Sequence, residues 1–312
     1  MKVGFVGIGA MGHPMANRLR EVGLLASAYD IDPARARSLG RADVAAPDLA
    51  ILARASDVVI TMLPSERALQ DVVLGPDGLV ALGLAGRTLL DMGTTSPALS
   101  RRLAEAVRSA GGSFVEAPVS GGTEAARQGT LTIIAAGDDE AYLRVRPALE
   151  VLGEKVFFVG PAGAGQTLKI ANNLLFAVNV AALGEAWSLV RSAGIAAELA
   201  FNVLVACSGD SRALRTRIPE AGLVPSAPPS RDFLPGFRTR LALKDLSLAT
   251  DLATALGLWA PMLEAVHRLY SAAVERGLGD LDVSVIGRRS ASSIDRGARS
   301  LTGTDRGGAS HA

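Results

Sequence analysis

Cysteine and histidine are scarce in this sequence of 312 residues, and its charges nearly balance. Cys207 is the only cysteine, which excludes an intramolecular disulfide and fits a reducing compartment. No cysteine and histidine residues have the spacing of metal ligands, so we expect no metal site. The net charge is +1 and no basic block runs through the part expected to fold, so nucleic acid is not an implied partner.

Uninterrupted apolar runs of membrane-spanning length are also missing. The segment from Leu174 to Val190 comes nearest, but Asn179 and Glu185 interrupt it, so we expect a buried core helix. Four glycines within the first twelve residues argue against a signal peptide. We therefore expect a cytoplasmic protein with no membrane partner.

Lysine is rare among the basic residues. Of 32 Lys and Arg residues only four are lysine: Lys2, Lys155, Lys169 and Lys244. Arginine stays protonated, whereas a lysine can release its proton when its surroundings lower its pKa. Lys2 and Lys155 lie beside expected strands and are interpreted as solvated charges, which leaves Lys169 and Lys244 as candidates for a chemical role.

A glycine-rich turn follows the first expected strand. The pattern G-x-G-x-x-G is formed by Gly7, Ile8, Gly9, Ala10, Met11 and Gly12. The first glycine permits a tight turn, the second lets the backbone approach a pyrophosphate, and the third lets helix and strand pack closely. A helix-compatible segment follows, so the pattern predicts a dinucleotide-binding loop.

An acidic residue, Asp30, ends the second expected strand. A carboxylate there accepts hydrogen bonds from the ribose 2′- and 3′-hydroxyls and would repel a 2′-phosphate. The next residues, Ile31 and Asp32, supply no arginine to hold such a phosphate, so the pattern favours NAD over NADP. Alternatively, either aspartate starts a turn or caps a helix, which is our interpretation of Asp32 before Pro33.

Short β-type runs alternate with helical patterns from residue 1 to about 160. The expected strands are 3–7, 24–29, 57–62, 87–91, 113–115, 131–135 and 155–159, and helical spacing occupies 14–22, 33–39, 47–54, 66–72, 97–109 and 139–152. This alternation predicts an α/β fold with a doubly wound parallel Rossmann sheet, whose ligands lie beyond the carboxyl ends of the strands. After the glycine-rich segment 160–165, strand patterns give way to long helices, which predicts an all-α C-terminal domain joined by a long helix from about 166.

Lys169 and Asn173 share one face of that long helix, because four positions separate them. Oxidation of an alcohol by hydride transfer needs a base for the hydroxyl proton, and the reverse reaction needs an acid. No histidine here has a supporting motif, so Lys169 is the candidate. The alternative is a lysine whose stem covers apolar surface, next to helix-capping asparagines.

Two loops after expected strands hold further candidates. The Ser120 hydroxyl and the amides of Gly121 and Gly122 could hold a substrate carboxylate, although a plain Ser-Gly-Gly turn explains the same residues. Thr94 could border the nicotinamide end of the cofactor, or it could cap the helix before Pro97.

These segments together resemble the β-hydroxyacid dehydrogenases, typified by 3-hydroxyisobutyrate dehydrogenase and tartronate semialdehyde reductase. The resemblance rests on residues 4–19, 61–64, 91–97, 117–131, 163–173, 237–249 and 273–286. It implies an NAD-binding Rossmann domain over 1–162, an all-α substrate-binding and dimerisation domain over 163–287, and a cleft between them. Residues 288–312 are expected to form a disordered tail, since they are rich in Gly, Ser and Arg.

The resemblance also implies roles for individual residues. Lys169 would be the catalytic acid or base, with Asn173 beside it on the substrate, and Ser120, Gly121 and Gly122 would bind the substrate carboxylate. The cofactor would contact the glycine loop and Asp30, and also Met62, Leu63, Pro64, Thr94, Phe237 and Lys244. Homodimers or homotetramers are usual in this family.

Three residues depart from the family pattern. Glu116 stands where the family usually has Asp, Gly93 where Ser is frequent, and Glu124 at a position that is usually small or apolar. These departures leave the chemistry in place and the substrate open.

The expected activity is an NAD-dependent interconversion of a short 3-hydroxy acid and its semialdehyde. One alternative is an imine reductase, which typically has Asp or Tyr at the position of Lys169. The other is a non-catalytic NAD(H)-binding module, and the joint presence of Lys169, Asn173 and Ser120 argues against it.

Overall fold

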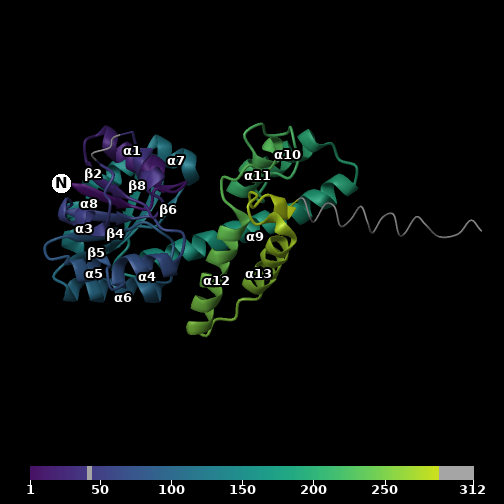
Figure 1. The fold of residues 1–312 in the computed structure, drawn as a ribbon. Helices are drawn as coiled ribbons and strands as arrows, with labels where there is room; N and C mark the ends of the chain where they lie inside the picture. Colours follow the sequence, from purple (N-terminus) through teal and green to yellow (C-terminus); the bar gives the residue numbers. More distant parts are fainter. Residues whose placement is uncertain (41–43, 288–312) are drawn as a thin grey trace, which may run out of the picture. The chain divides into compact units, whose positions relative to one another are not determined.

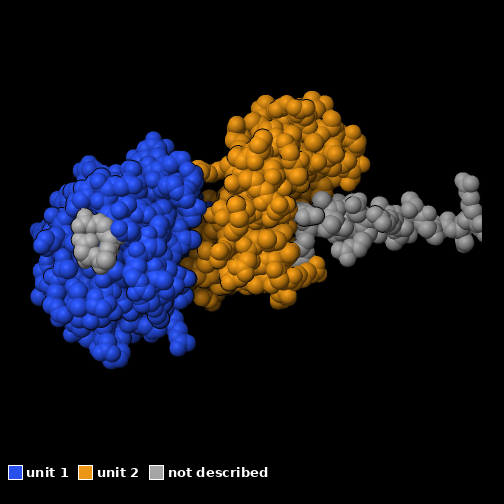
Figure 2. Space-filling model, turned by 45° about the horizontal axis from the view of Figure 1, so that its top comes forward, with its two compact units in different colours: residues 1–172 blue, residues 173–312 orange. Residues whose placement is uncertain are grey.

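A computed structural model describes residues 1–40 and 44–287 of the chain. The chain divides into two compact units: the first comprises residues 1–172, and the second starts at Asn173 (Figure 2). The predicted tail at 288–312 lies outside the described residues.

The first unit is built on a sheet of eight strands among its described residues. The strands are β1 (Val3–Val6), β2 (Leu25–Tyr29), β3 (Val58–Thr61), β4 (Thr88–Asp91), β5 (Ser113–Glu116), β6 (Val119–Ser120), β7 (Leu131–Gly137) and β8 (Gly153–Phe158). Their order is β2-β1-β3-β4-β5-β7-β6, with β8 also paired to β7. The strands β1 to β5 are mutually parallel, as the alternation predicts.

The far edge of the sheet differs from the parallel arrangement that the sequence predicts. β7 runs antiparallel to both β5 and β6, whereas β8 is parallel to β7. After β5 the chain forms the two-residue strand β6 and the seven-residue helix α7 (Gly122–Gln128). These two elements lie beyond the carboxyl end of β5. The next strand, β7, therefore runs in the direction opposite to β5, and its last residues pair with Val115 and Glu116.

Helices cover both faces of this sheet (Figure 1). One face packs against α1 (Gly12–Glu21), α7 and α8 (Asp139–Leu152), and the other against α3 (Leu49–Arg54), α4 (Glu66–Leu74), α5 (Leu79–Leu82) and α6 (Pro97–Ser109). Successive strand residues enter opposite cores: Ile60 and Val115 face the first, and Val59 and Phe114 face the second. The central strands β1, β3 and β4 are buried at every residue, as expected for a doubly wound sheet.

Side-chain caps fix where several of these helices begin. Asp32 accepts a hydrogen bond from Ala34 N at 3.0 Å, which confirms it as the cap of α2 (Pro33–Arg37). Ser96 accepts one from Leu99 N at 3.2 Å and caps α6 directly before Pro97.

Among the described residues of the second unit, the regular elements are all helices. The long helix α9 (Ala164–Ser192) enters it from the first unit. It is followed by α10 (Ala197–Ala206), α11 (Arg212–Arg217), the 3₁₀ turn η1 (Pro228–Arg231), α12 (Thr239–Ala255), α13 (Pro261–Ala273) and the π-helical turn η2 (Val274–Leu278).

Helix α9 is long and apolar enough to cross a membrane by length and composition alone, a test that core helices of soluble proteins also pass. Its side chains make polar contacts inside the second unit. Trp187 Nε1 donates to Glu220 Oε2 at 2.9 Å, and Asn173 Nδ2 donates to Asp245 Oδ2 at 2.6 Å. These contacts fit the core helix that the sequence predicts.

The buried carboxylate of Asp282 binds the backbone of the segment before α12. Asp282 is fully buried, accepts hydrogen bonds from Gly236 N and Phe237 N at 3.0 Å, and forms an ion pair with Arg217 Nε at 2.9 Å. Burial lowers the pKa of the Arg217 guanidinium, and the charge of Asp282 opposes that effect. Tyr270 packs in the same core, where burial raises the pKa of its hydroxyl.

Candidate active site

The glycine-rich loop joins β1 to α1, and its three glycines meet different surroundings. Gly7 has a φ of +96°, and a Cβ placed on it would collide with the carbonyl oxygen of Met62. A Cβ on Gly12 would collide with the carbonyl oxygen of Gly7. At Gly9 a Cβ would meet no atom within 4 Å, so this side of the loop is open to a pyrophosphate. The loop fits a dinucleotide on geometric grounds.

Asp30 lies beside this loop and is 7% exposed. Its carboxylate accepts hydrogen bonds from Ile8 N at 2.7 Å and from Asp32 N at 2.9 Å. An arginine also approaches it, because Arg35 Nη1 lies 3.8 Å from Asp30 Oδ1. The sequence prediction considered only Ile31 and Asp32 after Asp30 and missed Arg35, which lies on the first turn of α2. The Pro-Ala-Arg sequence after Asp32 is the signal that places it there.

The ends of β3 and β4 lie against the same loop. Met62 N donates to Val6 O at 2.9 Å, and the side chain of Leu63 lies 3.0 Å from the position of a Cβ on Gly7. Thr61 Oγ1 donates to Asp91 Oδ1 at 2.8 Å, which joins the two strand ends.

The structure therefore brings the glycine loop, Met62 and Leu63 together at the carboxyl edge of the sheet, and exposed Pro64 directly follows them. Thr94 follows β4 at the same edge, and it does not cap α6, since Ser96 does.

The proposed carboxylate-binding residues lie at the start of α7. Ser120 is half-buried in β6, where it pairs with Thr132. Gly121 and Gly122 have φ values of +143° and +74°, which side chains other than glycine rarely adopt. A Cβ on Gly121 would also lie 2.6 Å from the Cβ of Ala125, so the backbone path of this turn depends on glycine.

Lys169 and Asn173 lie on successive turns of α9 and are 7% and 8% exposed. Both asparagines near Lys169 lie inside the helix, so the alternative that they cap it is wrong. Asn173 Nδ2 donates to Asp245 Oδ2 at 2.6 Å, and Lys244 Nζ lies 3.1 Å from the other oxygen of Asp245.

Asp245 links two predicted site residues, Asn173 and Lys244, and sequence reasoning missed it. The available signal is an acidic residue directly after Lys244 in a helix of mostly apolar residues. Phe237 lies before the same helix, where its N–H donates to Asp282.

Glu116 is a second missed residue, noted in the sequence only as a departure from the family. It ends β5, is fully buried, and accepts hydrogen bonds from Gln166 N at 3.1 Å and from the Ser100 hydroxyl. Burial raises the pKa of its carboxyl from 4.5 to about 7. Backbone N–H groups at the start of α9 act in the opposite direction, and the negative charge of Asp91 adds to the rise.

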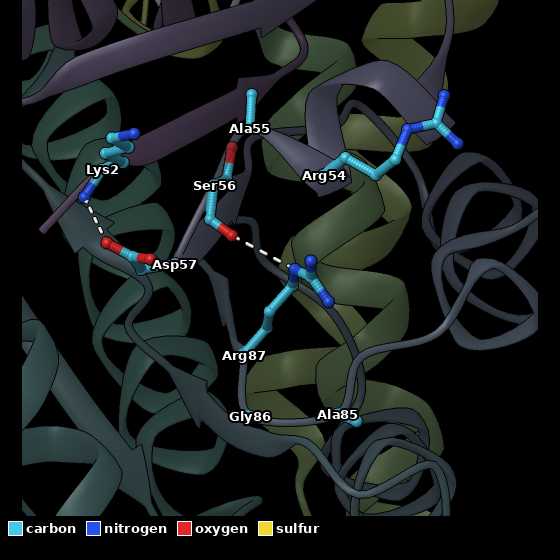
Figure 3. Close-up of a pocket in the computed structure, with 8 residues that line it drawn as sticks. All are labelled: Lys2, Arg54, Ala55, Ser56, Asp57, Ala85, Gly86 and Arg87. Carbon is cyan, nitrogen blue, oxygen red and sulfur yellow. Dashed lines mark hydrogen bonds between the residues drawn. The ribbon is translucent and has the colours of Figure 1, made fainter.

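A small cavity of about 260 Å³ lies at the opposite edge of the sheet (Figure 3). Lys2, Asp57 and Arg87, which line it, directly precede β1, β3 and β4. Ligands of doubly wound sheets bind beyond the carboxyl ends of the strands, so this cavity is not the candidate site.

A glycine loop at the carboxyl edge of a doubly wound sheet, followed by an all-helical unit, defines the class of dinucleotide-binding dehydrogenases. Residues 2–160 match the family described as the NAD binding domain of 6-phosphogluconate dehydrogenase. Residues 163–289 match the family described as NAD-binding of NADP-dependent 3-hydroxyisobutyrate dehydrogenase.

Individual relatives agree with these matches. The chain is 36% identical over 286 residues to NAD-dependent L-serine dehydrogenase of Pseudomonas aeruginosa, covering 91% of this chain and 96% of the relative. It is 34% identical to 2-hydroxy-3-oxopropionate reductase of Escherichia coli, covering 92% and 96%. Among solved structures, it is similar to 3-hydroxyisobutyrate dehydrogenase of Mycobacterium tuberculosis with L-serine, with a TM-score of 0.86, 33% identity and coverage of 92% and 98%.

The chain belongs to the β-hydroxyacid dehydrogenase family. It is an NAD(P)-dependent oxidoreductase that acts on the hydroxyl group of a small hydroxy acid. The relatives are named for reactions of hydroxy and oxo acids, which does not favour an imine reductase or a non-catalytic module.

Proposed function

We propose that this enzyme interconverts a short 3-hydroxy acid and its semialdehyde, with Lys169 as the acid or base. The observation that carries the proposal is a buried lysine on α9, one turn before the buried Asn173, in a chain with only four lysines among its 32 Lys and Arg residues. The relatives' names support the substrate class, because L-serine and 3-hydroxyisobutyrate are both 3-hydroxypropanoates that differ in the group on carbon 2.

Each proposed site residue has a separate role in the reaction. The dinucleotide, when bound, accepts or supplies the hydride. The Ser120 hydroxyl and the amides of Gly121 and Gly122 hold the substrate carboxylate, and Asn173 orients the reacting hydroxyl group. Lys169 Nζ removes the hydroxyl proton during oxidation and returns a proton to the oxygen during reduction.

We propose NAD as the preferred cofactor because the Asp30 carboxylate would repel a 2′-phosphate. Arg35, 3.8 Å from Asp30, offsets part of that repulsion, so NADP is expected as a weaker cofactor. The remaining cofactor contacts in the proposal are Met62, Leu63, Pro64, Thr94, Phe237 and Lys244.

The proposal extends to the domains, the assembly and the location of the protein. Residues 1–162 would bind NAD, and residues 163–287 would bind substrate and form a homodimer or homotetramer in the cytoplasm. Exposed leucines on α9 and α10 support self-association, since Leu175, Leu189 and Leu199 are 60–72% exposed. Light scattering after size-exclusion chromatography tests the oligomer, and a monomer would contradict this part of the proposal.

The Lys169→Arg variant tests the chemistry directly. We expect it to fold and to bind NADH normally, while turnover of 3-hydroxyisobutyrate and L-serine with NAD falls about 100-fold or more, because arginine does not release its proton. Lys155→Arg is the matched control, since Lys155 is exposed on β8. Near-normal turnover in Lys169→Arg, measured by NADH absorbance, would refute the assigned role.

A further inference from the structure

The first turn of α9 is anchored to the sheet by a carboxylate. Glu116 Oε1 accepts the N–H of Gln166 at 3.1 Å, and Glu116 Oε2 accepts the hydroxyl of Ser100 on α6. Gly165 lets the helix come this close, because a Cβ there would lie 2.7 Å from Ile134 O and 3.0 Å from Glu116 Oε1. The first N–H groups of a helix have no partner within it, so an acceptor at this point fixes the position of the helix start.

The same turn is also tied to the loop after β4. The Gln166 side chain is fully buried, its Nε2 donates to Gly93 O at 3.0 Å, and its Oε1 accepts Thr95 N at 3.1 Å. Thr94, a proposed cofactor contact, lies between these two bonded residues. Gln166 therefore bonds through its backbone to Glu116 and through its side chain to the loop that carries Thr94.

Lys169 lies three residues after Gln166 on the same helix, so the position of this turn decides where the amine points. We propose that Glu116 is a positioning residue: by holding Gln166, it sets the first turn of α9, and with it Lys169, in register with the 93–95 loop. The inference rests on the proposed role of Lys169 in the reaction. Glu116 itself contacts neither substrate nor cofactor in this account.

The length of the Glu116 side chain matters to this anchor. The family usually has Asp at this position, and Asp is one methylene shorter. In this chain the carboxylate spans two partners on different helices, Gln166 on α9 and Ser100 on α6. We therefore expect Glu116→Asp to lose one of these contacts. Glu116→Gln keeps an acceptor for Gln166 N, and its amide N–H can donate to the oxygen of the Ser100 hydroxyl in a bond of reversed direction.

Steady-state kinetics of three variants test the inference. We expect kcat to fall at least about tenfold in Glu116→Ala, less in Glu116→Asp, and at most about threefold in Glu116→Gln, because misplacing a reacting group lowers the rate of the chemical step. The KM for NAD should change less than about twofold in all three, since the glycine loop and Asp30 are untouched. Unfolded protein would lower the apparent kcat without changing KM, so kcat is normalised to the fraction of each variant that binds NADH.

Asp138→Asn is the matched control. Asp138 precedes α8, and its Oδ2 accepts the N–H of Phe114 on β5, the strand of Glu116, at 3.2 Å. Its hydrogen bonds within the described part of the chain do not reach α9. We expect kcat near that of the wild type. Equal kcat values for Glu116→Ala and the wild type would overturn the inference.

Amide hydrogen exchange separates this inference from the proposed function. In the apo form at pH 8, Glu116→Ala should exchange amides 166–170 at least about tenfold faster than the wild type, while α8 is unchanged. Unchanged exchange at 166–170 would overturn the positioning role, whatever the activity. Faster exchange in Glu116→Ala together with full turnover in Lys169→Arg would instead overturn the proposed function and leave the anchor standing.

Discussion

The buried carboxyl of Glu116 makes the stability of the first unit depend on pH, and Glu116→Gln removes that dependence. Burial raises the pKa of this carboxyl from 4.5 to about 7 in the folded protein. The folded state therefore binds the proton more tightly than the unfolded state does. The stabilisation from this proton is complete below pH 4.5 and is lost as the pH rises through 7.

The size of the effect follows from the two pKa values. One pKa unit corresponds to about 1.36 kcal/mol, so a pKa of about 7 in place of 4.5 costs about 3 kcal/mol of unfolding free energy at pH 8. Part of this loss has already occurred at pH 5.5, so the unfolding free energy of the wild type falls by about 2 kcal/mol between pH 5.5 and pH 8. The Gln variant has no such proton, so its unfolding free energy relative to the wild type should rise by about 2 kcal/mol over this interval.

Fluorescence is unsuited to this measurement, because both tryptophans, Trp187 and Trp259, lie in the second unit. Hydrogen exchange of the β5 amides of Phe114 and Val115, measured by mass spectrometry, reports on the stability of the first unit after correction for the intrinsic exchange rate at each pH. Comparing the two pH values within each protein cancels any packing change caused by the substitution itself. Parallel pH profiles for the wild type and Glu116→Gln would refute the reasoning.

Three further changes test other parts of the structure. Asp282→Asn should lower the unfolding free energy of the second unit by about 3 kcal/mol in a urea titration followed by tryptophan fluorescence, because it leaves the half-buried Arg217 without its charged partner; a loss below about 1 kcal/mol would contradict the ion pair's role. Asp30→Asn should shift the ratio of kcat/KM for NAD and NADP toward NADP at least about tenfold, since Arg35 then faces the 2′-phosphate without the opposing carboxylate; an unchanged ratio would contradict our account of Asp30. Gly9→Ala should melt like the wild type, as its Cβ meets no atom, yet bind NADH at least about tenfold more weakly in a fluorescence titration; normal binding would show that the pyrophosphate does not approach there.

Local sequence patterns predicted the parts of this protein that depend on neighbouring residues. The alternation of seven strands with helices in the first unit, the glycine loop and the cap at Asp32 follow from periodicity and turn chemistry over a few residues, whereas the short elements β6 and α5 were not predicted. The shared face of Lys169 and Asn173 follows from helical spacing alone. The family resemblance then assigned roles to these residues.

The tertiary structure decided which residues distant in the sequence are bonded to one another. Gln166 reaches Glu116 across 50 positions, and Asn173 reaches Asp245 across 72. The antiparallel course of β7 likewise depends on where the chain stands after β6, which no period of two or 3.6 residues records. Sequence periodicity predicts which face of an element is buried. The packing of separate elements decides the burial that raises the pKa of Glu116 and supplies the backbone N–H groups that oppose this rise.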